Sequence, residues 1–333
     1  MIAETILSDL TKKKYKPVYW LEGDEDFFID EITDFAAAHI LSESEASFNL
    51  TILYGKDTDW PTLYNTCRRY PMFAEKQVVI VKEAQDMRGI EKLESYIDKP
   101  SDTTLLFVAY KGKKVDGRTK LAKLLKEKAV LLTTKKLYDS QLPEWTADLV
   151  KKKGLSINGK ALYLLIDHIG NDLNRLNNEI DKLALNLGKS KTITEDAIEK
   201  YVGISKEFNV FELQQALAHG DFYKAMRIVQ YFEANPKAAP LQLIFPSLYS
   251  FFSKALVVFT VPGRDERAVA TALGVSPHFA RDYMQAAHRY GQQGIEKLLL
   301  LLHIYNLKSL GIGDAGTDDM ELLKEMLAKV MHD

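Results

Sequence analysis

The chain has 333 residues, which is enough for two or three domains that bury their own cores. Apolar residues make up 46% of the chain and charged residues 27%, an ordinary composition for a soluble globular protein. The formal net charge of -2 excludes an overall electrostatic field that would draw the chain onto nucleic acid or a membrane.

The sequence carries no sign of export or membrane insertion. No apolar run approaches the ~20 residues that span a bilayer, and the N-terminal segment lacks a signal-peptide core and cleavage site. The single cysteine, Cys67, rules out an internal disulfide and fits a reducing compartment. We therefore expect a cytoplasmic protein with no membrane contact.

Strand and helix patterns alternate in the first part of the chain. Apolar residues in 27–36 share one face of a helix, and another helix begins near Asp59 with Pro61 in its first turn. Short runs rich in β-branched and aromatic residues predict strands at 17–22, 48–54, 77–81, 103–109 and 129–133. Strands separated by helices predict a parallel sheet covered on both faces, so this part is expected to be α/β.

The strand signal stops after Lys136. Residues 141–203 predict short helices, and the apolar residues of 171–187 form a stripe along one face. Thr194 is a suitable N-cap for the helix that follows, because its hydroxyl can accept a backbone N–H. We expect a small all-helical region here.

From Phe208 onward the pattern is helical to the end. Pro246 is expected to bend or interrupt the apolar helix over 241–259. The chain therefore divides into an α/β domain, a small helical domain and a larger helical domain. Their predicted ranges are 1–138, 139–206 and 207–333.

An α/β domain followed by a small helical domain is typical of nucleotide-binding ATPases. These enzymes hold a triphosphate on a loop after the first strand, with glycine N–H groups, a lysine, and a Ser or Thr for magnesium. Here the strand runs into Gly23, Asp24, Glu25 and Asp26, whose three carboxylates would repel a triphosphate. We predict no ATP at this loop and expect Asp24 or Asp26 to cap the next helix.

Two other glycine patterns lack the context that nucleotide binding requires. Segment 112–119 matches a phosphate-binding loop except that Arg118 stands where lysine is required, and a planar guanidinium is a poor substitute for an ammonium. Segment 311–316 matches a dinucleotide fingerprint, but no strand precedes it. We expect a surface turn at the first segment and a turn between the last two helices at the second.

Metal and catalytic patterns are also missing from the sequence. The seven histidines are never three or four residues apart, and one cysteine is too few for a zinc set. Asp24, Asp26 and Asp30 loosely match a calcium loop, but its obligatory glycine is absent. No nucleophile elbow or Cys-His pair stands out. These patterns indicate a binding protein for which we expect no catalytic residue, cofactor or metal.

The main functional candidate lies in residues 60–81. Pro71 ends a helix and pushes Tyr70 out of helical geometry, so Met72 and Phe73 fall in a short connection before the third strand. One interpretation is that Met72 and Phe73 pack on the core, because large apolar residues favour burial. The other is an exposed apolar tip that enters a partner's pocket, for which adaptable Met and large Phe are suited.

The order of these features resembles that of the delta subunits of the bacterial DNA polymerase III clamp loader. The resemblance rests on segments spread over essentially the whole chain, at 18–31, 59–81, 171–185, 208–232 and 307–327. In the first of these, a Gly-x-Asp sequence takes the place of the phosphate loop of the AAA+ ATPase fold. Met72 and Phe73 match the family's two-residue hydrophobic wedge, with methionine where leucine is common, and Ala74 matches the alanine that follows.

The resemblance implies a three-domain, AAA+-like clamp-loader subunit that is non-catalytic within the DNA-directed DNA polymerase III holoenzyme. It implies that Tyr70, Pro71, Met72 and Phe73 bind the sliding clamp, the beta subunit, and that this contact opens the ring. It implies that the C-terminal domain is a helical collar shared with the delta-prime and gamma/tau subunits, in a complex that holds primer–template DNA. Ring opening would then be a population shift gated by neighbours that bind ATP.

A basic stretch over 111–153 holds thirteen basic and five acidic residues, a local charge of +8. Its simpler interpretation is a solvated face of two helices. Alternatively, Lys113, Lys114, Arg118 and Lys120 contact primer–template phosphates, and binding then weakens steeply with salt. Two other functions stay open: an AAA+-type ATPase that uses the loop at Gly112, and a DNA-binding helical protein that uses this stretch.

Overall fold

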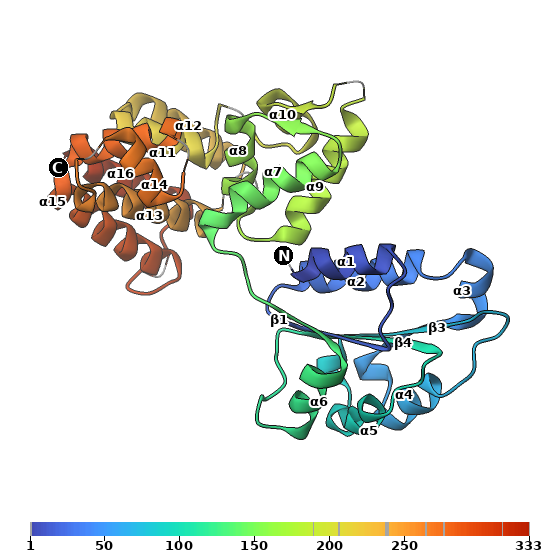
Figure 1. Cartoon of the computed structure of the whole chain (residues 1–333). Coiled ribbons are helices and arrows are strands. Elements are labelled where there is room, and N and C mark those ends of the chain that lie inside the picture. The colour runs from blue at the N-terminus through green and yellow to red at the C-terminus, as the bar shows by residue number, and fades with distance from the viewer. Residues whose placement is uncertain are drawn as a thin grey trace. The chain divides into compact units, whose positions relative to one another are not determined.

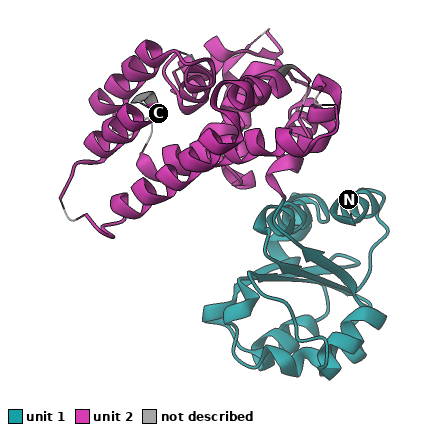
Figure 2. Cartoon of the chain, turned by 90° about the vertical axis from the view of Figure 1, so that its left-hand side faces the viewer, with its two compact units in different colours: residues 1–137 teal, residues 138–333 magenta. Residues whose placement is uncertain are grey.

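The computed structural model describes residues 2–188, 190–205, 207–236, 240–263, 265–275, 277–314 and 316–332. The chain forms two compact units, residues 1–137 and 138–333 (Figure 2). The first unit matches the predicted α/β domain to within one residue. The second contains both predicted helical domains, whose division at 206/207 stays a prediction, and Lys206 itself lies outside the described residues.

Unit 1 is built on a five-stranded parallel sheet in the order β2-β3-β4-β1-β5. Its strands are β1 Val18–Gly23, β2 Leu50–Tyr54, β3 Gln77–Lys82, β4 Thr104–Lys111 and β5 Val130–Thr134. Every strand lies within two residues of its predicted range, and β1 is buried along its whole length. The predicted strand at 48–54 begins late because Phe48 and Asn49 end the helix α3, Glu43–Asn49.

Helices cover both faces of this sheet, as predicted (Figure 1). The helices α1 Ile2–Thr11 and α2 Asp26–His39 lie on one face, and α4 Trp60–Cys67, α5 Glu94–Asp98 and α6 Lys120–Lys128 on the other. Short 3-10 turns complete the connections at η1 Gly55–Asp57, η2 Ala84–Asp86 and η3 Ile90–Leu93. The α4 side of the sheet carries a continuous apolar core that includes Trp20, Leu63, Val79, Leu106 and Leu125.

The first part of unit 2 contains a two-stranded parallel sheet that the sequence analysis missed. The paired strands are β6 Ser156–Ile157 and β7 Thr192–Ile193. Strands of two residues are too short to show an alternating pattern, so the expectation of an all-helical region was wrong here. The surrounding helices are η4 Asp139–Gln141, α7 Leu142–Lys152, α8 Gly159–Ile169, α9 Leu173–Asn186 and α10 Glu195–Tyr201. Thr194 caps α10 as predicted, and the apolar stripe of α9 is buried.

The rest of unit 2 is helical among the described residues. Its helices are α11 Val210–His219, α12 Phe222–Ala234, α13 Leu241–Val257, η5 Val258–Thr260, α14 Glu266–Leu273, α15 Pro277–Ser309 and α16 Asp319–His332. Pro246 lies inside α13 and does not interrupt it. The break occurs instead in α15 at Gly291, where a φ of 63° leaves the helical region.

The helix over Leu241–Thr260 is long and apolar enough to cross a membrane by length and composition. The sequence did not predict it, because Ser, Tyr and Lys side chains interrupt the apolar run. Leu241, Phe245, Leu248 and Phe252 of this helix are buried in the core of unit 2. Packing in this core accounts for part of the apolar composition, since 39% of the apolar window is buried.

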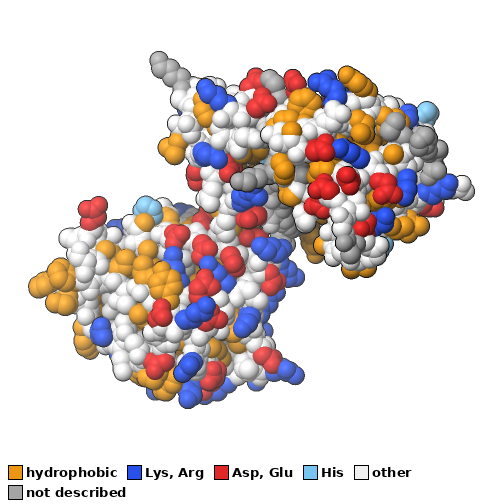
Figure 3. Space-filling model, turned by 180° about the vertical axis from the view of Figure 1, so that it is seen from behind, with side chains coloured by type: hydrophobic (Ala, Val, Ile, Leu, Met, Phe, Trp, Pro, Cys, Tyr) orange, Lys and Arg blue, Asp and Glu red, His pale blue; other side chains and the backbone are white. Residues whose placement is uncertain are grey.

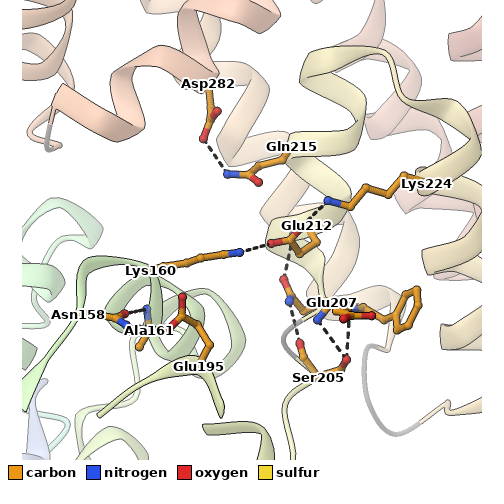
Figure 4. Close-up of polar contacts among 12 residues, drawn as sticks. Asn158, Lys160, Ala161, Glu195, Ser205, Glu207, Glu212, Gln215, Lys224 and Asp282 are labelled. Carbon is orange, nitrogen blue, oxygen red and sulfur yellow. Dashed lines mark hydrogen bonds and ion pairs between the residues drawn. The ribbon is translucent and has the colours of Figure 1, made fainter. Parts of the chain in front are cut away.

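A buried carboxylate connects the two helical parts of unit 2 (Figure 4). Glu212, at the start of α11, is 5% exposed. Its Oε1 lies 2.9 Å from Nζ of Lys160 on α8, and its Oε2 lies 2.5 Å from Nζ of Lys224 on α12. Burial raises the pKa of Glu212, but the hydrogen bonds from Lys224 and Lys160 outweigh burial, so the pKa lies below its usual value. Three helices are thereby joined through one charged side chain.

Candidate protein-binding site

The connection between α4 and β3 places four predicted site residues at the surface of unit 1. Phe73 is 93% exposed, Tyr70 86% and Met72 54%, and Pro71 is half-buried. We call residues 70–73 the tip. Hydrophobic side chains gather at the end of unit 1 that carries α3 (left in Figure 3). The tip is exposed, so the interpretation in which Met72 and Phe73 pack on the core is wrong.

The backbone of Phe73 is in an uncommon conformation. Its φ is 57°, in the left-handed region that bulky residues rarely adopt. Such a conformation costs on the order of 1–3 kcal/mol and persists only where the surrounding structure enforces it. The neighbours of the tip therefore have to hold it in place.

Asn49 holds the tip from one side. Its side chain is 3% exposed, and its Oδ1 accepts the N–H of Met72 at 2.7 Å. The amide nitrogen Nδ2 donates to the carbonyl of Met72 at 2.9 Å and to that of Glu45 at 3.0 Å. Both backbone groups of Met72 are thus paired with one buried side chain, so the residue before Phe73 cannot shift freely.

Gln77 holds the other side of the connection. Its Nε2 donates to the carbonyl of Arg69 at 2.7 Å and to Oγ1 of Thr104 at 2.8 Å. Thr104 in turn donates to the carbonyl of Cys67 at 2.8 Å. These bonds fix the last turn of α4 against β3 and β4. The tip is therefore an exposed apolar surface on a rigid base, which suits insertion into a preformed pocket.

The end of α4 is packed as well as hydrogen-bonded. The Arg68 guanidinium lies 5.3 Å from the ring centroid of Tyr64 and 5.4 Å from that of Tyr96, and it donates to the carbonyl of Lys99 at 2.6 Å. Burial raises the pKa of the Cys67 thiol to about 12. A thiol that stays protonated is a poor nucleophile, so Cys67 contributes packing to this helix.

The residue that precedes Asn49, Phe48, was not among the predicted site residues. It is 65% exposed at the end of α3. It directly precedes Asn49, the residue whose side chain pairs with the backbone of Met72. Asn49 and Gln77 were also missed, although a polar residue at the start of an apolar strand is a usable signal for a buried hydrogen-bonding role.

The turn after β1, where an ATPase would hold phosphate, is filled by the protein's own groups. The N–H of Gly23 donates to the Lys113 carbonyl at 3.1 Å. The N–H groups of Asp24 and Glu25 donate to the carbonyl and the hydroxyl of Thr134, at 3.4 and 3.1 Å. A Cβ on Gly23 would lie 2.2 Å from the Thr134 carbonyl oxygen, so the turn has no spare room.

Glu25 occupies the N-terminus of the helix that follows this turn. Its carboxylate is 1% exposed, accepts the N–H of Phe27 at 3.3 Å and pairs with Lys136 at 3.3 Å. Burial raises the pKa of Glu25, while the Phe27 N–H and Lys136 oppose that rise. The expectation that Asp24 or Asp26 caps α2 was wrong, because Glu25 turns inward and takes that position.

Comparison with known proteins finds similarity to one group of replication proteins. Residues 19–135 match the family model described as DNA polymerase III, delta subunit. The DNA polymerase III subunit delta of Bacillus subtilis is 23% identical over 334 residues, which cover 96% of this chain and 94% of that protein. The chain is a relative of the DNA polymerase III delta subunits.

Further comparisons agree with this relationship. The probable DNA polymerase III subunit delta of Aquifex aeolicus is 22% identical over 81% of this chain and 79% of its own length. The solved structure of the Bacillus subtilis DNA clamp loader delta protein covers 99% of this chain and 100% of its own, with 22% identity and a TM-score of 0.56. The match therefore confirms the mixed α/β and all-helical fold, and the stretch that matches the delta family model contains the tip.

The four lysine and arginine candidates for DNA contact divide into two pairs. Lys113 and Lys114 are exposed and make no ion pair among the described residues. Arg118 pairs with Asp116 at 2.7 Å, and Lys120 pairs with Glu94 at 3.3 Å. Only Lys113 and Lys114 therefore offer positive charge that an acidic neighbour does not already offset.

The other glycine segments form turns, as predicted. Gly112 has a φ of 64° and donates its N–H to the Gly23 carbonyl at 2.8 Å, and Thr119 uses its hydroxyl to cap α6. Gly311 and Gly313 have positive φ in the turn between α15 and α16. Ala315, which the second pattern includes, lies outside the described residues.

The acidic residues near β1 do not form a metal site within the described ranges. The Asp30 carboxylate lies 2.8 Å from the Lys111 ammonium, which also lies 3.0 Å from Glu83. Burial raises the pKa of Asp26, and Lys111 opposes that rise. A lysine thus pairs with Asp30, one of the carboxylates that loosely matched a calcium loop.

Proposed function

We propose that this chain is a clamp-loader subunit of DNA polymerase III that binds the sliding clamp through the tip and opens the ring during replication. The observation that carries the proposal is the 93% exposure of Phe73 on a hydrogen-bonded base, inside the stretch that matches the delta family model. A large apolar side chain that is held out in water gains free energy when a partner's pocket buries it.

The proposed domains are an AAA+-like domain over 1–138, a small helical domain over 139–206 and a helical collar domain over 207–333. The collar joins the delta-prime and gamma/tau subunits, and primer–template DNA lies within the complex. The chain acts in the cytoplasm and requires no cofactor of its own. Its place in the DNA-directed DNA polymerase III holoenzyme is non-catalytic.

The filled turn after β1 supports a subunit that does not hydrolyse ATP. A phosphate needs free N–H groups at a helix N-terminus, and here those of Gly23, Asp24 and Glu25 already have acceptors. The Glu25 carboxylate would repel a triphosphate at the same place. Without ATP hydrolysis by this chain, ring opening depends on a difference in affinity. The tip and its surroundings bind the open ring more tightly than the closed ring, and this shifts the equilibrium from closed to open rings.

Replacing Phe73 tests the proposal. Phe73→Ala should lower the affinity for the organism's own clamp by at least about 2 kcal/mol, or roughly thirtyfold, because it removes the anchor. Affinity is measured by surface binding of the purified chain without nucleotide. Tyr223→Ala is the control, since Tyr223 is also an exposed aromatic residue (77%) but lies on α12. Equal affinities for Phe73→Ala and the unaltered chain would refute the role of the tip.

A further inference from the structure

Unit 2 contains a large open groove for which the proposed clamp contact at the tip gives no role. It has a volume of about 850 Å³ and is bounded by α12, α15 and α16. Phe222, Tyr290, Leu298 and Val330 contribute its apolar lining. Leu298 and Val330 are nearly buried, so the groove reaches down to the core of the unit.

One wall of the groove is apolar and faces water. Leu300 is 61% exposed and Ile304 is 42% exposed. The two are four residues apart on α15 and therefore share one face of the helix. Scattered exposed aliphatic residues are ordinary, but a pair that lines a cavity of this size is typical of a surface that another protein covers.

The rim of the groove is positively charged. Arg289, Lys297 and Lys329 line it, together with one carboxylate, Glu325. Glu325 lies 3.0 Å from Lys329, and hydrogen bonds from Tyr305 and Lys329 lower the pKa of Glu325. Lys329 is therefore neutralised within the chain, whereas Lys297 makes no ion pair in the part of the chain that the structure describes.

Arg289 is held in place without an acidic partner among the described contacts. Its guanidinium lies 5.3 Å from the ring centroid of Phe222 and 5.7 Å from that of Tyr290. The backbone at Gly220 packs so closely that a Cβ there would lie 2.1 Å from the Arg289 guanidinium carbon. Two cations, Arg289 and Lys297, thus flank an apolar groove with their charges available to a ligand.

We propose that this groove receives an amphipathic helix of another clamp-loader subunit, with aliphatic side chains on one face and carboxylates at its edge. The apolar face of a helix fits a groove whose wall exposes an aliphatic side chain at every fourth residue of α15. Carboxylates at the edge of that helix would complement the charges of Arg289 and Lys297. The inference rests on the proposed function, because that function requires other clamp-loader subunits. It assigns the contact to one face of the C-terminal region, bounded by α12, α15 and α16.

Assembly with the organism's other purified clamp-loader subunits tests the inference. Leu300→Asp should weaken incorporation of the full-length chain by at least about tenfold in a titration followed by size-exclusion chromatography, because it places a charge in the apolar wall. Leu185→Asp is the matched control, since Leu185 is an 86% exposed leucine on α9. Equal incorporation of the two variants would overturn the assignment of the groove.

A charge reversal gives a second readout that does not depend on the apolar wall. Lys297→Glu should weaken assembly, and the loss should shrink as salt rises because the charge contact is screened. Lys151→Glu, an exposed lysine on α7, should leave assembly unchanged. Equal loss in the two charge variants would show a general charge effect and would contradict the acidic-helix partner.

Two further measurements separate this inference from the proposed function. Leu300→Asp should bind the clamp as the unaltered chain does, and Phe73→Ala should still assemble. Failure of the unaltered chain to assemble with any clamp-loader subunit would refute the proposed function itself. A homodimer of the unaltered chain in light scattering that Leu300→Asp abolishes would overturn the inference, because a second copy would then fill the groove.

Discussion

The two edges of the parallel sheet in unit 1 present opposite surfaces. At the carboxyl edge, after β1, the turn at Gly23 is closed by internal hydrogen bonds and by the buried Glu25 carboxylate. At the amino edge, before β3, the tip exposes Met72 and Phe73 to water. Ligands of open α/β sheets usually bind at the carboxyl edge. In this chain the turn after β1 at that edge is filled, and the best candidate for binding lies at the amino edge.

A parallel sheet can thus have a closed turn at its carboxyl edge and an exposed apolar surface at its amino edge. Both edges are rigid, but for different reasons. At the turn after Gly23, the backbone N–H groups donate to Lys113 and Thr134 and are not available to a ligand. The tip uses Asn49 and Gln77 to pair its backbone and leaves the apolar side chains free for a partner.

The largest expected effect at the base of the tip comes from Asn49→Ala. The change leaves both backbone groups of Met72 without their buried partner, which should lower the free energy of unfolding by about 1–3 kcal/mol. Clamp affinity should fall as well, but by less than in Phe73→Ala, because the side chains of the tip remain. Denaturant titration and surface binding measure the two quantities.

Asn65→Ala is the control for that change. Asn65 is an exposed residue of α4, so its loss should affect neither quantity by more than about 0.5 kcal/mol. If Asn49→Ala behaved like Asn65→Ala, the rigid base would play no part in presenting the tip.

An intermediate effect is expected for Lys113→Ala combined with Lys114→Ala. If these lysines approach DNA phosphates in the assembled loader, the slope of log affinity against log salt should become shallower by up to about 2. Arg118→Ala should leave the slope nearly unchanged, because Asp116 already neutralises Arg118. Fluorescence anisotropy of labelled primer–template DNA over a salt series measures the slope. A larger change for Arg118→Ala would reverse the assignment.

The smallest effect is expected for Glu25→Gln at the closed turn. Because the folded-state pKa of Glu25 is raised, folding favours its protonated form, and stability falls as pH rises from the unfolded pKa through the folded one. Glutamine keeps the acceptor for the Phe27 N–H and removes this pH-dependent loss. The variant should therefore be slightly more stable than the unaltered chain above that window.

Thermal melts over a pH series test this prediction. A variant that is less stable above the window would show that the ion pair with Lys136 outweighs the cost of burial. Calorimetry with ATP and magnesium should show no binding to either protein, because the turn's N–H groups remain paired. Binding by Glu25→Gln would show that the carboxylate alone closes the turn.

The strands of unit 1 were predictable because buried parallel strands leave continuous runs of β-branched residues, such as 77–81. The exposure of Phe73 was not predictable, because the sequence of a Met-Phe pair does not distinguish a buried position from an exposed one. The cap at Glu25 was missed because three acidic residues follow one another and only the backbone decides which turns inward. The sequence placed the tip, and the structure added Asn49 and Gln77, whose contacts join residues far apart in the chain.

Ring opening by the chain alone tests the central claim most directly. The measurement follows release of the organism's labelled clamp from circular DNA, with the purified chain added and no ATP present. The account predicts that the unaltered chain releases the clamp and that Phe73→Ala, equally folded, does not. Release at the same rate by both proteins, or by neither, would contradict it.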